Sequence, residues 1–327
     1  MRALQMATPS ADSSASRVVE VDEPMPGPGE VAIDVACAGV NFIDIMARRG
    51  DPGYAAGWPY IPGLEVAGTV CAVGAEVGEP RIGSRVAAFT AGGGLAEVAI
   101  APALLTAEVP PAVSLELAAA APLMLSTAVL LLESVVRLRA GESVMMHSAS
   151  GGVGSAVPQV AAALGGGVRV GVVGSPAKVP GALAAGWDHV VANDASATSA
   201  IRELAPGGID AILDPTGTEN LDIDLAVAAP GARVVLFGNP GGGTPAALPP
   251  LGRLIGGNVG ILGFSASSLS RTRPAAVRGA LRRSLSLLAD GEVLLDVTAV
   301  HGLEAVPGVH DLIAARRGSG KYVARIT

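Results

Sequence analysis

The strongest constraint on the fold is a regular alternation of strand-like and helix-like segments through the middle of the chain. Short apolar runs indicate strands at residues 143–147, 168–173, 189–191, 209–213 and 233–237. The longer segments between them indicate helices at residues 153–164, 177–185, 196–205 and 221–228. This alternation predicts an α/β fold with a doubly wound parallel sheet, which a further strand at residues 259–263 can extend.

The first third of the chain has a different pattern. Short apolar runs separated by glycine- and proline-rich segments predict strands at residues 18–21, 30–36, 66–73 and 85–89. We therefore expect a mostly β domain at the N-terminus. After Pro110 and Pro111, an alanine- and leucine-rich stretch at residues 114–138 suits helices better than strands, and it marks the crossing between domains.

Both ends of the chain are expected to form one domain. The length of 327 residues suits two domains of common size. A long helix is predicted at residues 274–290, and a final strand at 321–326 is expected to return to the N-terminal domain. The predicted division assigns residues 1–120 and 265–327 to that domain, and residues 121–264 to the parallel-sheet domain.

Charge and cysteine content exclude several classes of partner. The formal net charge is -7 and no dense lysine or arginine tract is present, which argues against binding to nucleic acid or to an anionic membrane surface. The first nine residues lack a signal-peptide pattern, and Pro122 and Glu133 interrupt the most apolar stretch. With Cys37 and Cys71 as the only cysteines, no disulfide framework is expected, and a reducing cytoplasm fits best.

A glycine-rich turn follows the first strand of the alternating region and leads into its first helix. In this position the turn predicts a dinucleotide site, because glycines let the backbone approach a pyrophosphate and the helix N-terminus offers free N–H groups. The alternative is a simple tight turn between strand and helix. Ala149 replaces the first glycine of the G-x-G-x-x-G pattern. The predicted cofactor residues of the turn are Ser150, Gly151, Gly152, Val153 and Gly154.

The end of the second strand indicates which dinucleotide binds. An NAD site places Asp or Glu there, against the ribose hydroxyls. Here Ser175 and Lys178 follow the strand instead, so a hydroxyl and a cation stand where a carboxylate would repel a 2′-phosphate. NADPH is therefore the predicted cofactor, with a solvated lysine as the alternative interpretation of Lys178. Pro158 lies inside the first helix and predicts a kink or a late helix start.

No metal site is predicted. Two cysteines and four scattered histidines do not have the spacing of a closed tetrahedral site. Each histidine is expected to be structural or solvated, although His147, beside the glycine-rich turn, could contact the cofactor. A Ser-His-Asp arrangement and paired carboxylates of convincing spacing are also missing from the sequence.

The sequence resembles a known family in several motifs. These motifs are at residues 38–44, 59–68, 83–86, 147–154 and 319–321. The chain is similar there to the zinc-independent quinone oxidoreductase and enoyl reductase branch of the medium-chain dehydrogenase/reductases. The resemblance implies a GroES-like β domain built from both termini, joined to a Rossmann domain, with the active site in the cleft between them.

The resemblance also implies roles for individual residues. Asn41 should lie by the nicotinamide, and Lys178 and Arg316 should approach the 2′-phosphate. Further cofactor contacts are implied for Thr127, Asn193, Phe237, Gly238, Asn239, Phe264 and Lys321. Met46 and Phe264 are implied to line the substrate pocket.

The sequence departs from its relatives in ways that bear on chemistry. Zinc-dependent relatives place Cys and His where this chain has Asn41 and Leu64. Many quinone oxidoreductases of the branch have Tyr at the positions of Met46 and Asn193. Methionine makes the pocket more apolar and removes a hydroxyl that could bind or protonate a substrate oxygen. The loss of the second Tyr weakens the prediction of NADPH.

The predicted reaction is reduction of a quinone or an α,β-unsaturated carbonyl compound, either an enone or an enoyl thioester, by hydride transfer from NADPH. The oxygen left anionic needs a proton donor, for which Tyr54 is the chosen side chain and bulk water the rival. The alternatives are a zinc-free alcohol or carbonyl oxidoreductase and a crystallin-like or sensor protein that binds NADPH without turnover. A homodimer is expected through an edge strand at residues 259–265.

Overall fold

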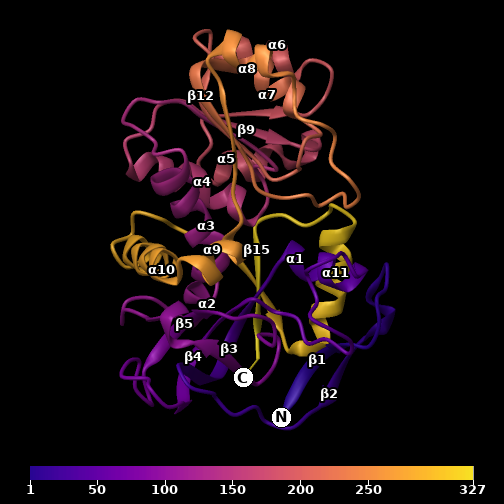
Figure 1. Cartoon of the computed structure of the whole chain (residues 1–327), viewed down its shortest axis with the longest axis vertical. Helices are drawn as coiled ribbons and strands as arrows, with labels where there is room; N and C mark the ends of the chain where they lie inside the picture. The colour runs from indigo at the N-terminus through magenta and orange to yellow at the C-terminus, as the bar shows by residue number, and fades with distance from the viewer. Residues whose placement is uncertain (327) are drawn as a thin grey trace. The chain divides into compact units, whose positions relative to one another are not determined.

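The computed structural model describes residues 1–326. It divides into two compact units, which are described separately (Figure 1). Unit 1 consists of Met1–Thr127 with Ala266–Thr327, and unit 2 of Ala128–Ser265. The sequence placed these limits after residues 120 and 264.

Unit 2 contains a six-stranded sheet in which every pairing is parallel. Its strands are β8 (Val144–His147), β9 (Arg169–Val173), β10 (His189–Ala192), β11 (Ile209–Asp214), β12 (Ala228–Leu236) and β13 (Gly260–Gly263). The spatial order is β10-β9-β8-β11-β12-β13. The chain therefore builds outward from β8 in one direction and then from β11 in the other. This confirms the predicted doubly wound sheet, including the added sixth strand.

The helices of unit 2 alternate with these strands. They are the π-helix η4 (Leu130–Val135), α4 (Gly152–Ala163), the 3-10 helix η5 (Pro176–Lys178), α5 (Val179–Ala184), α6 (Ala197–Leu204), α7 (Leu221–Val227) and α8 (Leu251–Gly257). The core includes Met145, Val170, Ile212 and Val234 from the strands and Ile201 from α6. Because these strands are covered by helices, they are apolar along most of their length.

Helix α4 corrects one expectation. It begins at Gly152, directly after the glycine-rich turn, and continues through Pro158 to Ala163. Of the two effects expected of Pro158, a kink or a late helix start, the late start was therefore wrong. The segment predicted as one helix at residues 177–185 is divided into η5 and α5, each of which has a proline in its first turn.

Unit 1 contains a seven-stranded sheet and a separate pair of strands. The sheet order is β14-β15-β3-β4-β5-β7, with β6 also paired to β3, while β1 and β2 form a separate two-stranded sheet. The strands are β1 (Arg2–Met6), β2 (Ser16–Glu20), β3 (Glu30–Val40), β4 (Glu65–Val73), β5 (Arg85–Phe89), β6 (Val98–Pro102), β7 (Thr106–Glu108), β14 (Val297–His301) and β15 (Lys321–Arg325).

The C-terminal segment completes the sheet of unit 1. Strand β15 lies antiparallel to β3, with Tyr322 opposite Val40 and Arg325 opposite Cys37. The two strands are separated by most of the chain, so one domain is built from both termini, as the resemblance implied. Its core includes Ile33, Val40, Val66 and Ala324, all fully or almost fully buried.

The helices of unit 1 include several that the sequence did not predict. They are the 3-10 helices η1 (Ser13–Ala15), η2 (Ala103–Leu105) and η6 (Leu303–Ala305), the π-helix η3 (Ala121–Leu125), α1 (Phe42–Arg49), α2 (Leu115–Ala118), α9 (Ala266–Thr272), α10 (Pro274–Ala289) and α11 (Val306–Ala314). Helix α3 (Ser126–Val129) spans the limit between the two units in the sequence. The sequence predicted none of α1, α9 and α11. Helix α1 begins after Asn41 and ends at Gly50, a left-handed residue typical of helix C-termini.

Candidate functional site

The glycine-rich turn of unit 2 joins β8 to α4. Gly151 is the N-cap of α4 and is extended, so the first turn of the helix presents its unpaired backbone N–H groups. A Cβ atom on Gly154 would lie 2.5 Å from the carbonyl oxygen of Ser148. Only glycine therefore allows the helix to approach the turn this closely. Backbone N–H groups at a helix N-terminus form a suitable binding site for a pyrophosphate.

The carboxyl end of β9 lies one strand away in the same sheet. Ser175 is the N-cap of η5, and Lys178, its last residue, is half-exposed. The backbone N–H of Asn193, after β10, donates to the carbonyl oxygen of Val173 at 2.8 Å. Asn193 thus lies beside the segment that carries Ser175 and Lys178. Residues 174–178 include no acidic side chain, so nothing in that segment repels a 2′-phosphate.

Further predicted residues follow β12 and β13 at the same edge of the sheet. The N–H of Phe237 donates to Asp214 O, and the N–H of Phe264 donates to Leu236 O, both at 3.0 Å. The amide of Asn239 donates to Gly243 O at 3.0 Å. The structure therefore brings the turns containing Phe237, Asn239 and Phe264 to the carboxyl edge of the sheet in unit 2.

A buried polar cluster lies where the strand order reverses, and the sequence reading missed two of its three members. His147 ends β8, Asp214 ends β11 and Asp224 belongs to α7. All three are at most 2% exposed. His147 Nε2 lies 2.7 Å from Asp224 Oδ1, while Asp214 Oδ1 accepts from the Thr216 backbone N–H at 2.7 Å. His147 is therefore structural, as expected, although its partners are far from it in the sequence.

The histidine and its partner carboxylate hold a proton strongly. Burial acts to lower the pKa of His147, but the hydrogen bond to Asp224 and that carboxylate's charge outweigh burial and raise the pKa. Burial raises the pKa of Asp224 by more than His147 lowers it. Both shifts favour the state in which the pair keeps its proton. Without that proton, the pair would have an uncompensated negative charge in an apolar interior.

The predicted residue Asn41 in unit 1 is held by a second buried network. Its Nδ2 donates to Glu65 Oε1 at 2.9 Å, and its Oδ1 accepts from Lys321 Nζ at 2.6 Å. Lys321 Nζ also bonds to Glu65 Oε1, and Glu65 Oε2 accepts from the Leu123 N–H at 2.7 Å. Glu65 and Lys321 are at most 2% exposed, while Asn41 is half-buried. Both ends of the Asn41 amide are therefore fixed.

The role assigned to Lys321 changes as a result. Its ammonium group has three hydrogens and three protein acceptors, the third being Val40 O at 3.1 Å. Lys321 was expected to contact the cofactor, but in this structure it orients Asn41 and balances the charge of Glu65. Gly39 makes room for the network, because a Cβ atom there would lie 2.2 Å from Glu65 Oε1.

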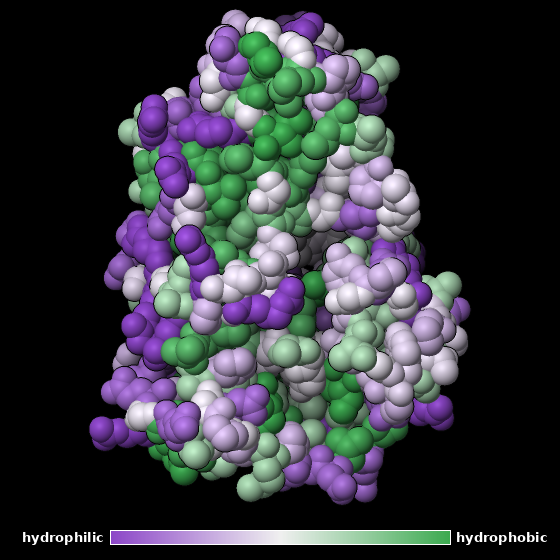
Figure 2. Space-filling view, viewed as in Figure 1, coloured by the Kyte–Doolittle hydropathy of each residue, from purple (hydrophilic) through white to green (hydrophobic). Residues whose placement is uncertain are grey.

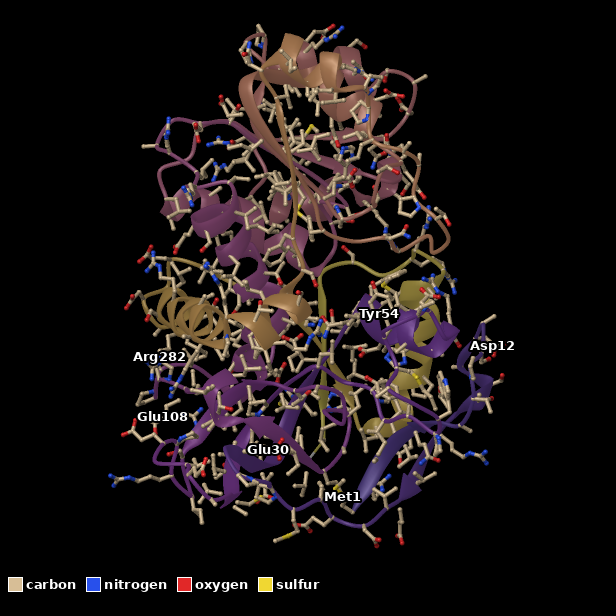
Figure 3. All side chains as sticks on the ribbon, in the orientation of Figure 1. Met1, Asp12, Glu30, Tyr54, Glu108 and Arg282 are labelled. Atoms are coloured by element: carbon tan, nitrogen blue, oxygen red, sulfur yellow. The ribbon has the colours of Figure 1, made fainter. Side chains whose placement is uncertain are left out.

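The residues predicted for substrate and proton transfer lie in or after α1. Met46 is only 7% exposed within α1. Tyr54 is half-buried in the turn that follows (Figure 3), and its hydroxyl has no hydrogen-bond partner among residues 1–326. A nearby tyrosine was overlooked in the sequence. Burial and, to a lesser extent, the charge of Asp44 raise the pKa of Tyr60 to about 12, which makes it a weaker acid than an ordinary tyrosine.

The remaining predicted contacts of unit 1 differ in exposure. Thr127 is 6% exposed in α3. Arg316 is exposed after α11 with a positive φ of 58°. An exposed guanidinium can reach an anion, whereas a buried threonine contributes through packing or one hydrogen bond.

The site in unit 1 does not fit a catalytic zinc ion. Leu64 has no donor atom at the position where zinc-dependent relatives have His. Asn41 Oδ1 and Glu65 Oε1 both accept from the Lys321 ammonium group, which would repel a divalent cation. The side chains at this position therefore support chemistry that does not use a metal here.

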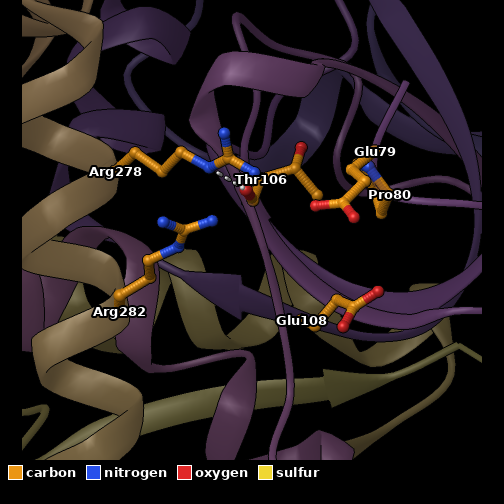
Figure 4. A pocket seen from close by; sticks show the side chains of 6 residues that line it. All are labelled: Glu79, Pro80, Thr106, Glu108, Arg278 and Arg282. Carbon is orange, nitrogen blue, oxygen red and sulfur yellow. Dashed lines mark hydrogen bonds between the residues drawn. The ribbon is translucent and has the colours of Figure 1, made fainter. Parts of the chain in front are cut away.

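A separate hollow of about 180 Å³ lies elsewhere in unit 1 (Figure 4). Arg278 and Arg282 extend from α10 toward Glu79 and Glu108, and Arg278 Nε donates to Thr106 O at 3.1 Å. Two cations face two carboxylates, so the charges offset each other. None of the lining residues belongs to the predicted site.

The sequence matches two families, one within unit 1 and the other over most of unit 2 and the first part of the C-terminal segment of unit 1. Residues 27–111 match the alcohol dehydrogenase GroES-like domain, and residues 152–288 match the zinc-binding dehydrogenases. The probable quinone oxidoreductase of Schizosaccharomyces pombe is 31% identical over 322 residues, which cover 95% of this chain and 93% of that protein.

Solved structures agree with these matches. A mycobacterial protein in complex with NADPH has a TM-score of 0.89 at 31% identity, covering 99% of each chain. Escherichia coli quinone oxidoreductase in complex with NADPH has a TM-score of 0.88 at 26% identity, covering 99% of this chain and 100% of that one.

The fold and the glycine-rich turn define a two-domain oxidoreductase. The chain belongs to the medium-chain dehydrogenase/reductases, in their quinone oxidoreductase branch. Among the described residues, no helix combines the length and the apolar character needed to cross a membrane.

Proposed function

We propose that this protein reduces a quinone or an α,β-unsaturated carbonyl compound with NADPH and without a metal. The observation that carries this proposal is the turn between β8 and α4, where Gly154 allows the close approach and the helix N-terminus offers backbone donors. Two solved relatives are complexes with NADPH, which supports the same cofactor here.

NADPH is preferred over NADH because of the groups after β9. Ser175 and the half-exposed Lys178 supply a hydroxyl and a cation for the 2′-phosphate. Arg316 is proposed as a second cation for that phosphate. The backbone of residues 151–154 would hold the pyrophosphate, and the turns containing Phe237, Asn239 and Phe264 would hold the nicotinamide end.

The bound nicotinamide supplies the hydride, so the protein's task is to orient the reactants and stabilise charge. Asn41 is proposed to act at the nicotinamide end. Its amide is fixed by Glu65 and Lys321, so it loses little conformational freedom on binding. Met46 gives the substrate pocket an apolar wall, which suits a quinone or enone ring.

Reduction of a conjugated carbonyl leaves negative charge on its oxygen. We propose that the hydroxyl of Tyr54 donates a proton or hydrogen bond to that oxygen, since the hydroxyl has no partner among the described residues. Tyr60 is the poorer candidate because burial raises its pKa to about 12. In the alternative, water supplies the proton and replacement of Tyr54 leaves the rate unchanged.

The test is a titration of the purified protein with NADPH and NADH, followed by addition of a quinone and then an enoyl thioester. Tight NADPH binding with loss of the nicotinamide absorbance band is the expected result, and the acceptor that works identifies the substrate class. Binding without oxidation by any acceptor would favour a sensor or crystallin-like protein. Failure to bind either nucleotide would refute the proposal.

We also propose a homodimer that forms along β13. This strand is the last of the sheet in unit 2 and pairs only with β12 among the described residues. Leu248, Leu251 and Ile255 nearby are each more than half exposed, and Figure 2 shows hydrophobic residues over the region where Figure 1 labels α8 and β12. Exposed strand edges and apolar patches favour self-association. Light scattering that gives the mass of one chain would contradict the dimer.

The cytoplasm is the proposed location. Cys37 and Cys71 lie on neighbouring strands, β3 and β4, yet both are free thiols. Free thiols persist in a reducing compartment. Fractionation of the native host, with an antibody to the chain, tests this assignment.

A further inference from the structure

A continuous series of hydrogen bonds connects the buried cluster of unit 2 to Asn193. The Thr216 hydroxyl donates to Asp214 Oδ1 at 2.5 Å. Asn220 Nδ2 donates to Thr216 Oγ1 at 2.7 Å, and Asn193 Nδ2 donates to Asn220 Oδ1 at 3.1 Å. Asp214 is fully buried, Asn220 is 8% exposed and Asn193 is exposed. We call this series the Asp214–Asn193 ladder.

The carboxylate at the base of the ladder fixes the direction of every bond above it. The Thr216 hydroxyl donates its single hydrogen to Asp214 Oδ1. Thr216 Oγ1 can then only accept from Asn220, which must present its Nδ2. The opposite end of that amide, Asn220 Oδ1, is left to accept from Asn193. The orientation of the Asn193 amide is therefore set from the protein interior.

The ladder ends beside the expected position of the adenosine 2′ group. The Asn193 backbone N–H donates to Val173 O at 2.8 Å, which places Asn193 next to the segment carrying Ser175 and Lys178. One hydrogen of its Nδ2 is used by Asn220. The second hydrogen and Oδ1 remain available at an exposed position.

We propose that Asn220 is a positioning residue for cofactor specificity, acting through Asn193. The ladder aims the second N–H of Asn193 at the 2′-phosphate of NADPH, a group that NADH lacks. This inference rests on the proposed function, since it requires a dinucleotide in unit 2. Discrimination between NADPH and NADH then depends on the fixed amide of Asn193 as well as on the cation of Lys178. Many relatives have Tyr at the position of Asn193.

The experiment measures the dissociation constants of NADPH and NADH by nicotinamide fluorescence for wild type, Asn193→Ala, Asn220→Ala and the double variant. Loss of a hydrogen bond to a charged group predicts that Asn193→Ala lowers the preference for NADPH about tenfold. Asn220→Ala is expected to cause a similar loss, because the amide of Asn193 is then free to rotate. The double variant should resemble the single variants, since both act through one contact.

A matched control and a second variant keep the test decisive. Ser199→Ala removes an exposed side-chain hydrogen bond of α6 outside the ladder and should change neither dissociation constant. Thr216→Ala breaks the ladder one step lower and should repeat the loss if Asn220→Ala does not fold. The proposal is overturned if Asn220→Ala and Thr216→Ala keep the wild-type preference, or if the effects of Asn193→Ala and Asn220→Ala add. Wild-type protein that binds neither nucleotide would instead refute the proposed function.

Discussion

Trp187 donates its indole N–H to the backbone carbonyl oxygen of Gly154 at 2.9 Å. That carbonyl lies four residues before Pro158 in α4, where a helical N–H would normally bond to it. Proline has no N–H, so Trp187 supplies the missing donor from outside the helix. A proline that breaks a local rule is thereby accommodated beside the glycine-rich turn.

Replacement of Trp187 by Phe should destabilise the protein. The change keeps most of the buried ring but removes the N–H that donates to the carbonyl oxygens of Gly154 and Ala149, at a cost of about 1–3 kcal/mol. Chemical denaturation followed by circular dichroism would measure the change. Pro158→Ala supplies the N–H within α4, so the same Trp187→Phe change should cost less in that background. Equal costs in both backgrounds would show that Trp187 does not compensate for Pro158.

The sequence predicted the framework of unit 2 well because local patterns determine it. Every predicted strand there corresponds to an observed one, and the glycine-rich turn lies where a strand meets a helix. The local pattern gave the wrong start for β12. The strand was predicted to begin at residue 233, but it begins at Ala228. Pro230 and Gly231 read as a turn, and the register of β12 against β11 is irregular at this point.

The polar networks could not be predicted in the same way. His147 and Asp224 are 77 residues apart, and Glu65 and Lys321 are 256 residues apart. The first contact joins a strand to a helix and the second joins two strands, and both depend on packing that only the folded chain provides. Helix α1 was missed because it is short and directly follows the long strand β3. The Asn41 and Gly50 caps were the available signals.

Loss of Lys321 should reveal the cost of an unbalanced buried charge. Lys321→Met leaves the buried carboxylate of Glu65 with no cation and should lower the free energy of unfolding by about 3–5 kcal/mol. A double variant, Lys321→Met with Glu65→Gln, removes both charges and should recover part of that loss. The readout is urea denaturation of both variants. A double variant less stable than Lys321→Met would contradict the pairing of these two charges.

Stability should fall as the pH rises through the range where the His147–Asp224 pair loses its proton. The pKa of His147 is raised above its ordinary value of 6.5, and that of Asp224 is raised as well. The folded protein therefore binds more protons than the unfolded chain, so this stabilisation is complete below the unfolded pKa and is lost as pH passes the folded one. Denaturation between pH 6 and 9 would measure the slope. The double variant His147→Gln with Asp224→Asn should reduce it, and an unchanged slope would assign the effect to other groups.

Gly154→Ala should abolish most of the nucleotide binding. The added Cβ would lie 2.5 Å from Ser148 O and 2.6 Å from Ala149 O, so α4 and the turn must separate. The backbone donors would then no longer converge on a pyrophosphate, and affinity for both NADPH and NADH should fall at least about tenfold. Isothermal titration calorimetry gives both constants. Gly207→Ala is the matched control, because a Cβ there has no neighbour within 4 Å and lies outside the turn. If both variants bind as wild type does, the close approach at Gly154 is not required for the cofactor. Equal losses in the two variants would point to a general effect on folding.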